Sequence, residues 1–416
     1  MNSTKVSGYD KKLQVATKGG ITGDKQKIVL SLLGSLSGDE IRASTPPACY
    51  LVRSGRNPDA RPLSERLPIS EETITMDLAN QKSSITNGSP LDPATGFTGR
   101  RITRFSTTPF VHIPVMAQNV TDLFLAVPSG TILDATIGGG GHSYEILKSR
   151  NDLDVIGIDQ DLEALNAAET KLADFAGRVT LCHGRFDNLT GIVNDAGKQK
   201  ISGVVFDLGV SSYQLDNSHR GFSFRNDGPL DMRMNRDSKI TAQNLVNEST
   251  AEELAHLFQH YGDERYSKRI AHAIVAKRPI ESTKLLAEII RDAIPARSKR
   301  SPGHPARRSF QALRIAVNCE LEILESSIRQ AIELLETGGR GVVLSYHSGE
   351  DKIVKRLLRE LAGLNTNNSK YHPEIKKTPK IRLLARKAER ASNNEASKNP
   401  RSSSALLRKF EKVGEG

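Results

Sequence analysis

Residues 133–143, LDATIGGGGHS, place four consecutive glycines directly after a short apolar run. Such a glycine cluster lets the backbone turn sharply or come close to a ligand. The preceding TILDATI is typical of a buried strand, and the following HSYEILKSR is typical of a helix. A strand, a glycine loop and a helix in this order predict a cradle for a nucleotide-like ligand at the end of the strand.

The pattern around this loop predicts an α/β fold with a parallel sheet. The strand-like segments LDVIGIDQD, VTLCHGRF and ISGVVFDLGV follow it, and a helical segment separates the first two. Strands that alternate with helices at this spacing are typical of βαβ units. The alternation stops after Met234, and residues 241–295 contain predicted helices alone. A long amphipathic helix over 309–335, closed by the TGG at 337–339, then leads back to the strand GRGVVLSYHS.

These patterns divide the chain into five segments. Residues 1–108 are rich in Ser, Thr, Gly, Pro and Asn, and we expect a mostly disordered extension there. The α/β domain is expected over 109–236 and again over 307–364, with a helical insertion at 237–306 between the two parts. Residues 365–416 form a predicted basic tail.

The charge pattern favours a polyanionic partner. The net charge of the chain is +11, and residues 365–416 hold 13 Lys and Arg residues against 5 Asp and Glu residues. RNA is a partner that such a distribution suits, and a solvated basic surface is the alternative. No apolar run approaches the roughly 20 residues of a membrane span, and the N-terminus lacks the apolar core of a secretory signal. We therefore expect a cytoplasmic protein with no membrane partner, and an organellar form with an unusual leader is the alternative.

The glycine loop lacks the features of phosphate-binding loops. A Walker loop ends in Gly-Lys-Ser/Thr, but Gly141 is followed by His142 and Ser143. The third glycine of the dinucleotide fingerprint is also missing, because its position falls on Ser143 or Tyr144. Asp159 ends the next strand, where an acid typically accepts the ribose hydroxyls of an adenosine. An adenosine without phosphates, such as S-adenosylmethionine, fits this pattern, and a structural turn beside a solvated acid is the alternative.

The stretch DLGVSSYQLDNSHRGFSFRNDGPLDMRM, residues 207–234, closely resembles the signature of the RsmH (MraW) family. Further matches follow the family's order: HIPVM, GGGGHS, YGDERYSKRIAHAI, HPARRSFQALRIAVN, SYHSGEDKIVKR and NPRSSSALLRKFEK. The resemblance covers roughly residues 110–412. The chain departs from the family pattern at Cys319 and at Gly349, and the glycine is expected to loosen the loop of the neighbouring His347 and Ser348.

The resemblance implies a Rossmann-like class I methyltransferase sheet with an inserted all-helical domain. It implies methyl transfer from S-adenosylmethionine to the exocyclic N4 amine of a cytidine in 16S rRNA, near the decoding region of the small ribosomal subunit. The cofactor contacts that it implies are Gly140, Gly141, His142, Asp159, Phe186, Asp207 and Gln214.

The implied reaction needs a hydrogen-bond acceptor beside the target amine. This amine is conjugated to its ring and weakly nucleophilic, so an acceptor has to hold its N–H and orient its lone pair. Asp207, at a predicted carboxyl strand end, is one candidate, with Ser211 and Ser212 just after it. Asp231 is a further candidate. The alternatives are structural, with the serines capping the next turn and Asp231 paired with Arg233.

Aromatic and basic residues near these acids are candidates for holding the RNA. The target base has to leave its stack to reach the pocket, and Phe222 and Phe224 would stack against it or belong to the core. The candidates for phosphate contacts are Arg220, Arg307 and Arg308, and those for pocket contacts are His347 and Ser348.

Two other functions stay open from the sequence. One is a non-catalytic RNA-binding factor of ribosome assembly that retains the fold, and the other is an amino-methyltransferase acting on DNA. The glycine loop with Asp159 and Asp207 favours an enzyme, and the resemblance favours RNA. His347 and Glu350 lack the further ligands of a metal site, so no metal is predicted. A homodimer is one assembly that the sequence leaves open.

Overall fold

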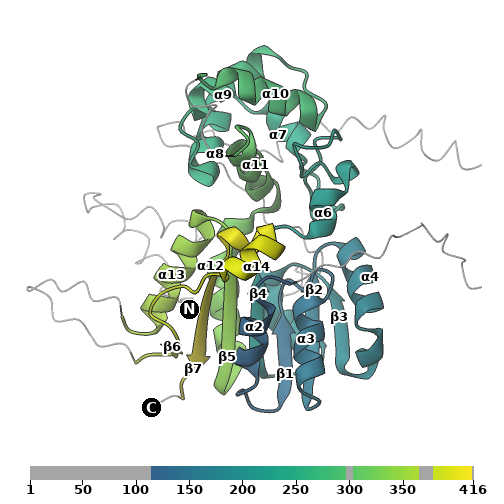
Figure 1. Ribbon diagram of the computed structural model, residues 1–416, viewed down its shortest axis with the longest axis vertical. Helices are drawn as coiled ribbons and strands as arrows, with labels where there is room; N and C mark the ends of the chain where they lie inside the picture. Colours follow the sequence, from purple (N-terminus) through teal and green to yellow (C-terminus); the bar gives the residue numbers. More distant parts are fainter. Residues whose placement is uncertain (1–113, 297–302, 365–377, 415–416) are drawn as a thin grey trace, which may run out of the picture. The chain divides into compact units, whose positions relative to one another are not determined.

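The computed structural model describes residues 114–296, 303–364 and 378–414, and a seven-stranded sheet lies at its centre. The strands are β1 (Gly130–Asp134), β2 (Leu153–Asp159), β3 (Val179–His183), β4 (Ile201–Asp207), β5 (Leu335–Ser345), β6 (Ile381–Leu383) and β7 (Leu406–Lys412). Their order is β3-β2-β1-β4-β5-β7-β6 (Figure 1). β1 to β5 are parallel, and β7 is antiparallel to both of its neighbours. The sheet confirms the predicted Rossmann-like α/β fold.

Helices cover both faces of this sheet. They are α2 (Ala117–Phe124), α3 (Gly141–Ser149), α4 (Leu162–Lys171), α5 (Leu189–Asp195), α12 (Glu320–Leu334) and α13 (Ser348–Leu361). Successive strand residues point to opposite faces, so Ile132 packs with α2, α3 and α4, whereas Leu133 packs with α5, α12 and α13. Because β1, β2, β4 and β5 are parallel, their carboxyl ends meet at one edge, where open α/β sheets bind ligands.

A second hydrophobic core belongs to the helices between β4 and α12. They are α6 (Ser212–Asp216), α7 (Ala242–Glu248), α8 (Ala251–Gly262), α9 (Ser267–Ala276), α10 (Thr283–Ala293) and α11 (Arg307–Asn318). Phe258 of α8, Ile290 of α10 and Phe310 of α11 are buried together, and Phe222 and Met232 join them. The helical unit therefore reaches beyond the predicted boundaries of 237 and 306, because hydrophobic periodicity does not show which core a segment joins.

The helix predicted over 309–335 is in fact two helices. Cys319 has a left-handed conformation with a φ of 52° and separates α11 from α12. The Asn318 side chain stabilises the break, since it accepts from the Met234 amide at 2.8 Å and donates to the Met232 carbonyl at 2.9 Å. The break lets α11 pack in the helical core while α12 packs against the sheet. The TGG at 337–339 lies inside β5 and does not close a helix.

The segment predicted as a basic tail contributes to the sheet. β6 and β7 form its last two strands, and Leu407 and Phe410 of β7 are fully buried. Residues 378–414 therefore complete the α/β domain, which corrects the predicted boundary at 365. The extension predicted over 1–108 lies outside the described residues. Within the part of the chain that the structure describes, no helix is long and apolar enough to cross a membrane.

Candidate active site

The glycine loop joins β1 to α3 at the carboxyl edge of the sheet. Gly140 has a φ of +77°, and a Cβ there would lie 3.1 Å from the Leu172 side chain, so this position needs glycine both for its conformation and for its packing. A Cβ on Gly139 would meet nothing within 4 Å. The loop therefore leaves open space on one side, as a cradle for a ligand requires.

Asp159 at the end of β2 ties this loop to the neighbouring strand. Its carboxylate accepts from the Gly138 amide at 3.0 Å and from the Asp161 amide at 2.9 Å. Desolvation raises the pKa of Asp159 to about 6. A carboxylate offers about four acceptor positions, so Asp159 retains capacity for hydroxyl donors of a ligand.

Asp207 at the end of β4 is where the glycine loop, β5 and α3 meet. Its amide donates to the Thr136 hydroxyl at 2.7 Å. The Tyr346 hydroxyl, just after β5, donates to Asp207 Oδ1 at 2.6 Å, and His142 Nε2 of α3 lies 3.5 Å from Oδ2. The Asp207 side chain is 21% exposed, so the fixed carboxylate still reaches the surface of the site. Sequence reasoning missed Tyr346, although it stands directly before the predicted His347.

His142 is buried with an unsatisfied ring. Its Nδ1 has no hydrogen-bond partner among the described residues. Burial by itself lowers the pKa of His142, but Asp207 and, more weakly, Asp134 and Glu145 raise it above the usual value. A buried polar atom without a partner is costly, so the free ring nitrogen indicates that a ligand completes this side of the site.

Asp134 lies beneath the glycine loop and was also missed. It is 2% exposed and accepts from the Ser143 hydroxyl at 2.6 Å. Desolvation raises the pKa of Asp134 to about 6. The only hint in the sequence was an aspartate within the strand-like start of LDATIGGGGHS. The pattern of strand residues does not decide whether this position is apolar or polar.

Arg220 is buried and does not fit the predicted phosphate contact. Its side chain is 1% exposed, and its guanidinium pairs with Asp161 and Glu163 at 2.7 Å each. It also donates to the carbonyls of Arg233 and Met234. Four of its five N–H groups are used in these bonds and the side chain is enclosed, so we assign Arg220 a structural role instead of an RNA contact.

Three other polar candidates are held in local contacts. Ser211 caps α6 in a reciprocal pair with Gln214, whose amide also donates to Asp161 at 2.9 Å. Asp231 pairs with Arg233 at 2.7 and 2.9 Å, and although burial raises the pKa of Asp231, these bonds hold it below its usual value. Ser211 therefore caps a helix and Asp231 pairs with Arg233, as the structural alternatives for these two residues predicted. The side chain of Ser212 lies outside the described part of the structure.

The predicted aromatic residues lie in or beside the cores. Phe222 is 6% exposed in the helical core. Phe224 is half-buried, stacks on His304 with ring centroids 4.5 Å apart, and contacts Phe310 edge to face. Phe186 is half-buried against Phe206 with centroids 6.1 Å apart. Phe222 is therefore a core residue, and the predicted ligand contacts of Phe186 and Phe224 stay predictions.

The loop after β5 is held firmly. His347 caps α13, with Nδ1 accepting from the Gly349 and Glu350 amides, and Nε2 lies 3.0 Å from Glu350 Oε1. Glu350 is 2% exposed and accepts from the Tyr346 amide at 2.7 Å. Burial raises the pKa of Glu350, but His347 and Arg314 hold it below its usual value. Gly349 thus sits in a fixed cap, which corrects the expected loosening.

The remaining candidates lie at the junction with the helical unit. The Ser348 hydroxyl donates to the Asp263 carboxylate at 3.3 Å. Arg307 and Arg308 begin α11 and are exposed, and Arg308 donates to the Asp263 carbonyl at 3.2 Å. Within the described residues, no three His, Cys, Asp or Glu side chains could hold a metal together.

The fold and the site define a class I methyltransferase, because the antiparallel β7 between β5 and β6 and the acids after β2 and β4 are the marks of that class. S-adenosylmethionine is the methyl donor of such enzymes. The open side of Gly139, the unpartnered His142 nitrogen and the Asp159 carboxylate fit this group.

The chain belongs to the MraW methylase family, whose model matches residues 109–413. It is 45% identical over 310 residues to ribosomal RNA small subunit methyltransferase H of Thermobifida fusca, covering 73% of this chain and 94% of that protein. The protein of the same name from Heliobacterium modesticaldum is 46% identical over 314 residues, covering 73% and 99%. A solved rRNA methylase from Streptococcus thermophilus is 12% identical with a TM-score of 0.33, covering 71% of this chain and 95% of that one.

Proposed function

We propose that the protein transfers a methyl group from S-adenosylmethionine to the exocyclic N4 amine of a cytidine in 16S rRNA, near the decoding region. The family, and the rRNA methyltransferases that the chain matches at 45% and 46% identity, support the substrate class. The resemblance of residues 207–234 supports the cytosine amine. The observation that carries the proposal is the Asp207 carboxylate, fixed by Tyr346 at the carboxyl edge of the sheet.

Asp207 is proposed as the acceptor for the target amine. Its partly exposed carboxylate accepts an N–H of the amine and orients the nitrogen lone pair toward the methyl group. The bound cofactor supplies an electrophilic methyl group, so an N–C bond forms as an S–C bond breaks. The methylated nitrogen then carries one proton too many, which passes to Asp207 Oδ2, 3.5 Å from His142 Nε2.

The cofactor is proposed to lie between the glycine loop and the acids of the neighbouring strands. Gly140, Gly141 and His142 would face its methionine part, Asp159 would accept the ribose hydroxyls, and Phe186 would contact the adenine. The implied contact of Gln214 is indirect in this proposal, because both ends of its amide already hold Ser211 and Asp161.

The target base is proposed to enter from the junction with the helical unit. His347 and Ser348 line this entrance, and the exposed Arg307 and Arg308 are placed to contact phosphates. The base has to leave its stack, which costs a few kcal/mol. A cytoplasmic location, and a homodimer as one assembly, stay predictions.

Transfer of tritium from labelled cofactor to isolated small ribosomal subunits that lack the modification tests this function. Mass analysis of the digested rRNA should show N4-methylcytidine at one position, and Asp207→Asn should lower its rate of formation about 10²- to 10⁴-fold. Label in another nucleoside would contradict the N4 assignment, and label in duplex DNA in preference to subunits would favour a DNA substrate. Failure to bind the cofactor at high micromolar concentration by calorimetry would favour a non-catalytic assembly factor.

A further inference from the structure

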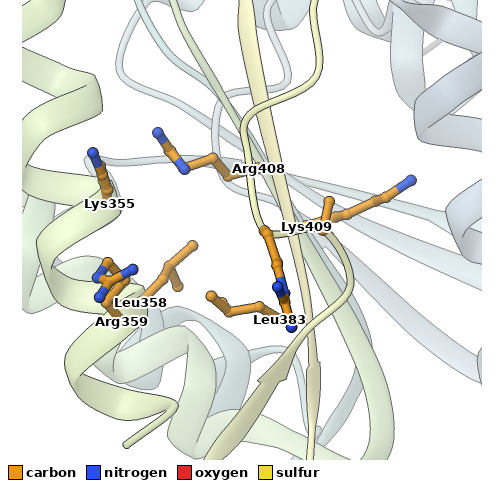
Figure 2. Close-up of a pocket in the computed structure, with 8 residues that line it drawn as sticks. Lys355, Leu358, Arg359, Leu383, Arg408 and Lys409 are labelled. Atoms are coloured by element: carbon orange, nitrogen blue, oxygen red, sulfur yellow. The ribbon is translucent and has the colours of Figure 1, made fainter. Parts of the chain in front are cut away.

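A basic pocket lies between α13 and the C-terminal strands. Five of its eight lining residues are Lys or Arg, and none is acidic. Lys355 and Arg359 of α13, Arg386 after β6 and Arg408 of β7 surround a floor that includes Leu358 and Leu383. Figure 2 shows Lys355 and Arg359 on the helix opposite the strand that carries Arg408, with the two leucines between them.

Only part of this positive charge is neutralised within the described residues. Arg408 makes two bonds to Asp351, at 2.8 and 3.1 Å. Lys409 extends away from the pocket (Figure 2) and pairs with Glu389 at 2.6 Å. Neither Lys355 nor Arg386 has an ion pair with a described residue, and Arg359 donates to the Leu364 carbonyl alone.

Three cations that have no acidic partner among the described residues lie around one concavity and create a site for an anion. Their mutual repulsion is relieved when an anion with several oxygens lies between them. The planar guanidinium of arginine suits phosphate oxygens, and lysine binds phosphate as a point charge. The negative end of the α13 dipole favours Arg359 in the last turn, but it does not explain Lys355 one turn earlier or Arg386 on another segment.

α13 connects this pocket to the active site. The helix begins at Ser348, and Lys352, Lys355 and Arg359 follow it by 4, 7 and 11 residues, a spacing that places all four on one side of a helix. At about 1.5 Å per residue, Lys355 and Arg359 lie about 10 and 16 Å along the axis from Ser348. A nucleic-acid backbone that leaves the entrance at Ser348 would reach the pocket within a few nucleotides.

We propose that this pocket binds a backbone phosphate of the same RNA whose base enters the active site. The inference rests on the proposed function, because it takes the RNA substrate as the source of the phosphate. It gives the enzyme a second anchor on the face of α13, separate from the junction with the helical unit. Binding there positions the strand and carries no base specificity.

The test uses the full chain with the double change Lys355→Gln and Arg386→Gln. Its affinity for isolated small subunits is measured at several salt concentrations and compared with that of the wild type. The double variant loses this one phosphate contact, so its slope of log K against log salt should be smaller than the wild-type slope by about 0.7 to 0.9. Its affinity at about 0.1 M salt should fall at least about fivefold. Both side chains are exposed, so the thermal midpoint and the affinity for S-adenosylmethionine should not change.

The matched control removes two charges elsewhere. Lys148 and Lys171, on α3 and α4, are exposed and make no ion pair with a described residue. The double change of these lysines to Gln should leave the slope within about 0.5 of the wild-type value. The charge-retaining double variant Lys355→Arg and Arg386→Lys should restore most of the affinity.

The outcomes separate the pocket from the reaction. If the slope falls equally in the pocket variant and in the control, the effect is one of net charge. This result would overturn the proposal that the pocket binds phosphate. An unchanged slope in the pocket variant, with normal N4-methylcytidine formation, would overturn phosphate binding by the pocket and leave the proposed function intact. A pocket-dependent slope in a protein that forms no N4-methylcytidine would support the pocket and overturn the proposed function.

Discussion

Tyr346→Phe removes a single oxygen and tests whether Asp207 has to be held in place. The hydroxyl donates to Asp207 Oδ1 at 2.6 Å, whereas the contact of Oδ2 with His142 is longer, at 3.5 Å. A hydrogen bond to a charged group contributes about 1.5–3 kcal/mol. Because Asp207 is 21% exposed, water recovers part of that free energy in the variant. The effect should therefore fall mainly on the orientation of the carboxylate.

We expect kcat to fall about 10- to 100-fold, which corresponds to about 1.4–2.8 kcal/mol of transition-state stabilisation. KM for S-adenosylmethionine should change by less than about twofold, since Tyr346 is not among the proposed cofactor contacts. Initial rates of tritium transfer to small subunits, measured at saturating cofactor and then at saturating subunits, give both constants.

Tyr261→Phe is the matched control. The Tyr261 hydroxyl of α8 also donates to a carboxylate, that of Glu322, so the same chemical group and the same kind of bond are lost. This variant should lose stability and keep its kcat. A wild-type kcat in Tyr346→Phe would refute the positioning of Asp207 by Tyr346. Equal losses of kcat in both variants would attribute the effect to stability.

Three further predictions concern the proposed acceptor, the glycine loop and the acid beneath it. Asp207→Asn should lower methyl transfer about 10²- to 10⁴-fold, because an amide does not accept the proton of the amine, and near-normal tritium incorporation would reject Asp207 as the acceptor. Gly139→Val points a side chain into the open space of the loop, so calorimetry should show cofactor binding at least about tenfold weaker at an unchanged thermal midpoint; Gly177→Val, where a Cβ also meets nothing within 4 Å, should bind normally. Asp134, with its pKa raised to about 6, is favoured in the protonated form by folding, so its contribution to stability is complete below about pH 4 and is lost as the pH rises through 6. Asp134→Asn should therefore gain up to about 3 kcal/mol over the wild type at pH 7 and nothing at pH 4 in urea unfolding, and a gain that does not vary with pH would contradict the raised pKa.

The sequence predicted those parts of the site that local patterns encode. The glycine loop, Asp159 and Asp207 each follow a predicted strand, and the strands of a parallel sheet end at a common edge. The contact of Tyr346 with Asp207 joins residues 139 positions apart, and no local pattern carries it. Asp134 was missed for a related reason, because its burial depends on the helices that cover β1.

The same limit explains the error at Arg220. An arginine in a loop beside predicted catalytic residues is typical of a phosphate contact. Only the folded chain shows that the guanidinium of Arg220 is enclosed. Arg220 is enclosed because of Asp161, which stands two residues after Asp159 and is itself 3% exposed. A buried carboxylate requires a partner, and Arg220 with Gln214 provides it.

The buried contact between Arg220 and Asp161 also joins the two parts of the proposed site. Asp159 of the cofactor side and Asp161 belong to the same turn after β2, where the Asp159 carboxylate accepts from the Asp161 amide. Arg220 belongs to the segment that starts at Asp207 and leads into the helical unit. Removing one partner of such a buried pair costs about 3–5 kcal/mol, because the other charge stays buried and unpaired. The segment 207–234 thus starts at the proposed acceptor and, through Arg220, is attached to the turn that carries Asp159, the proposed ribose-binding acid.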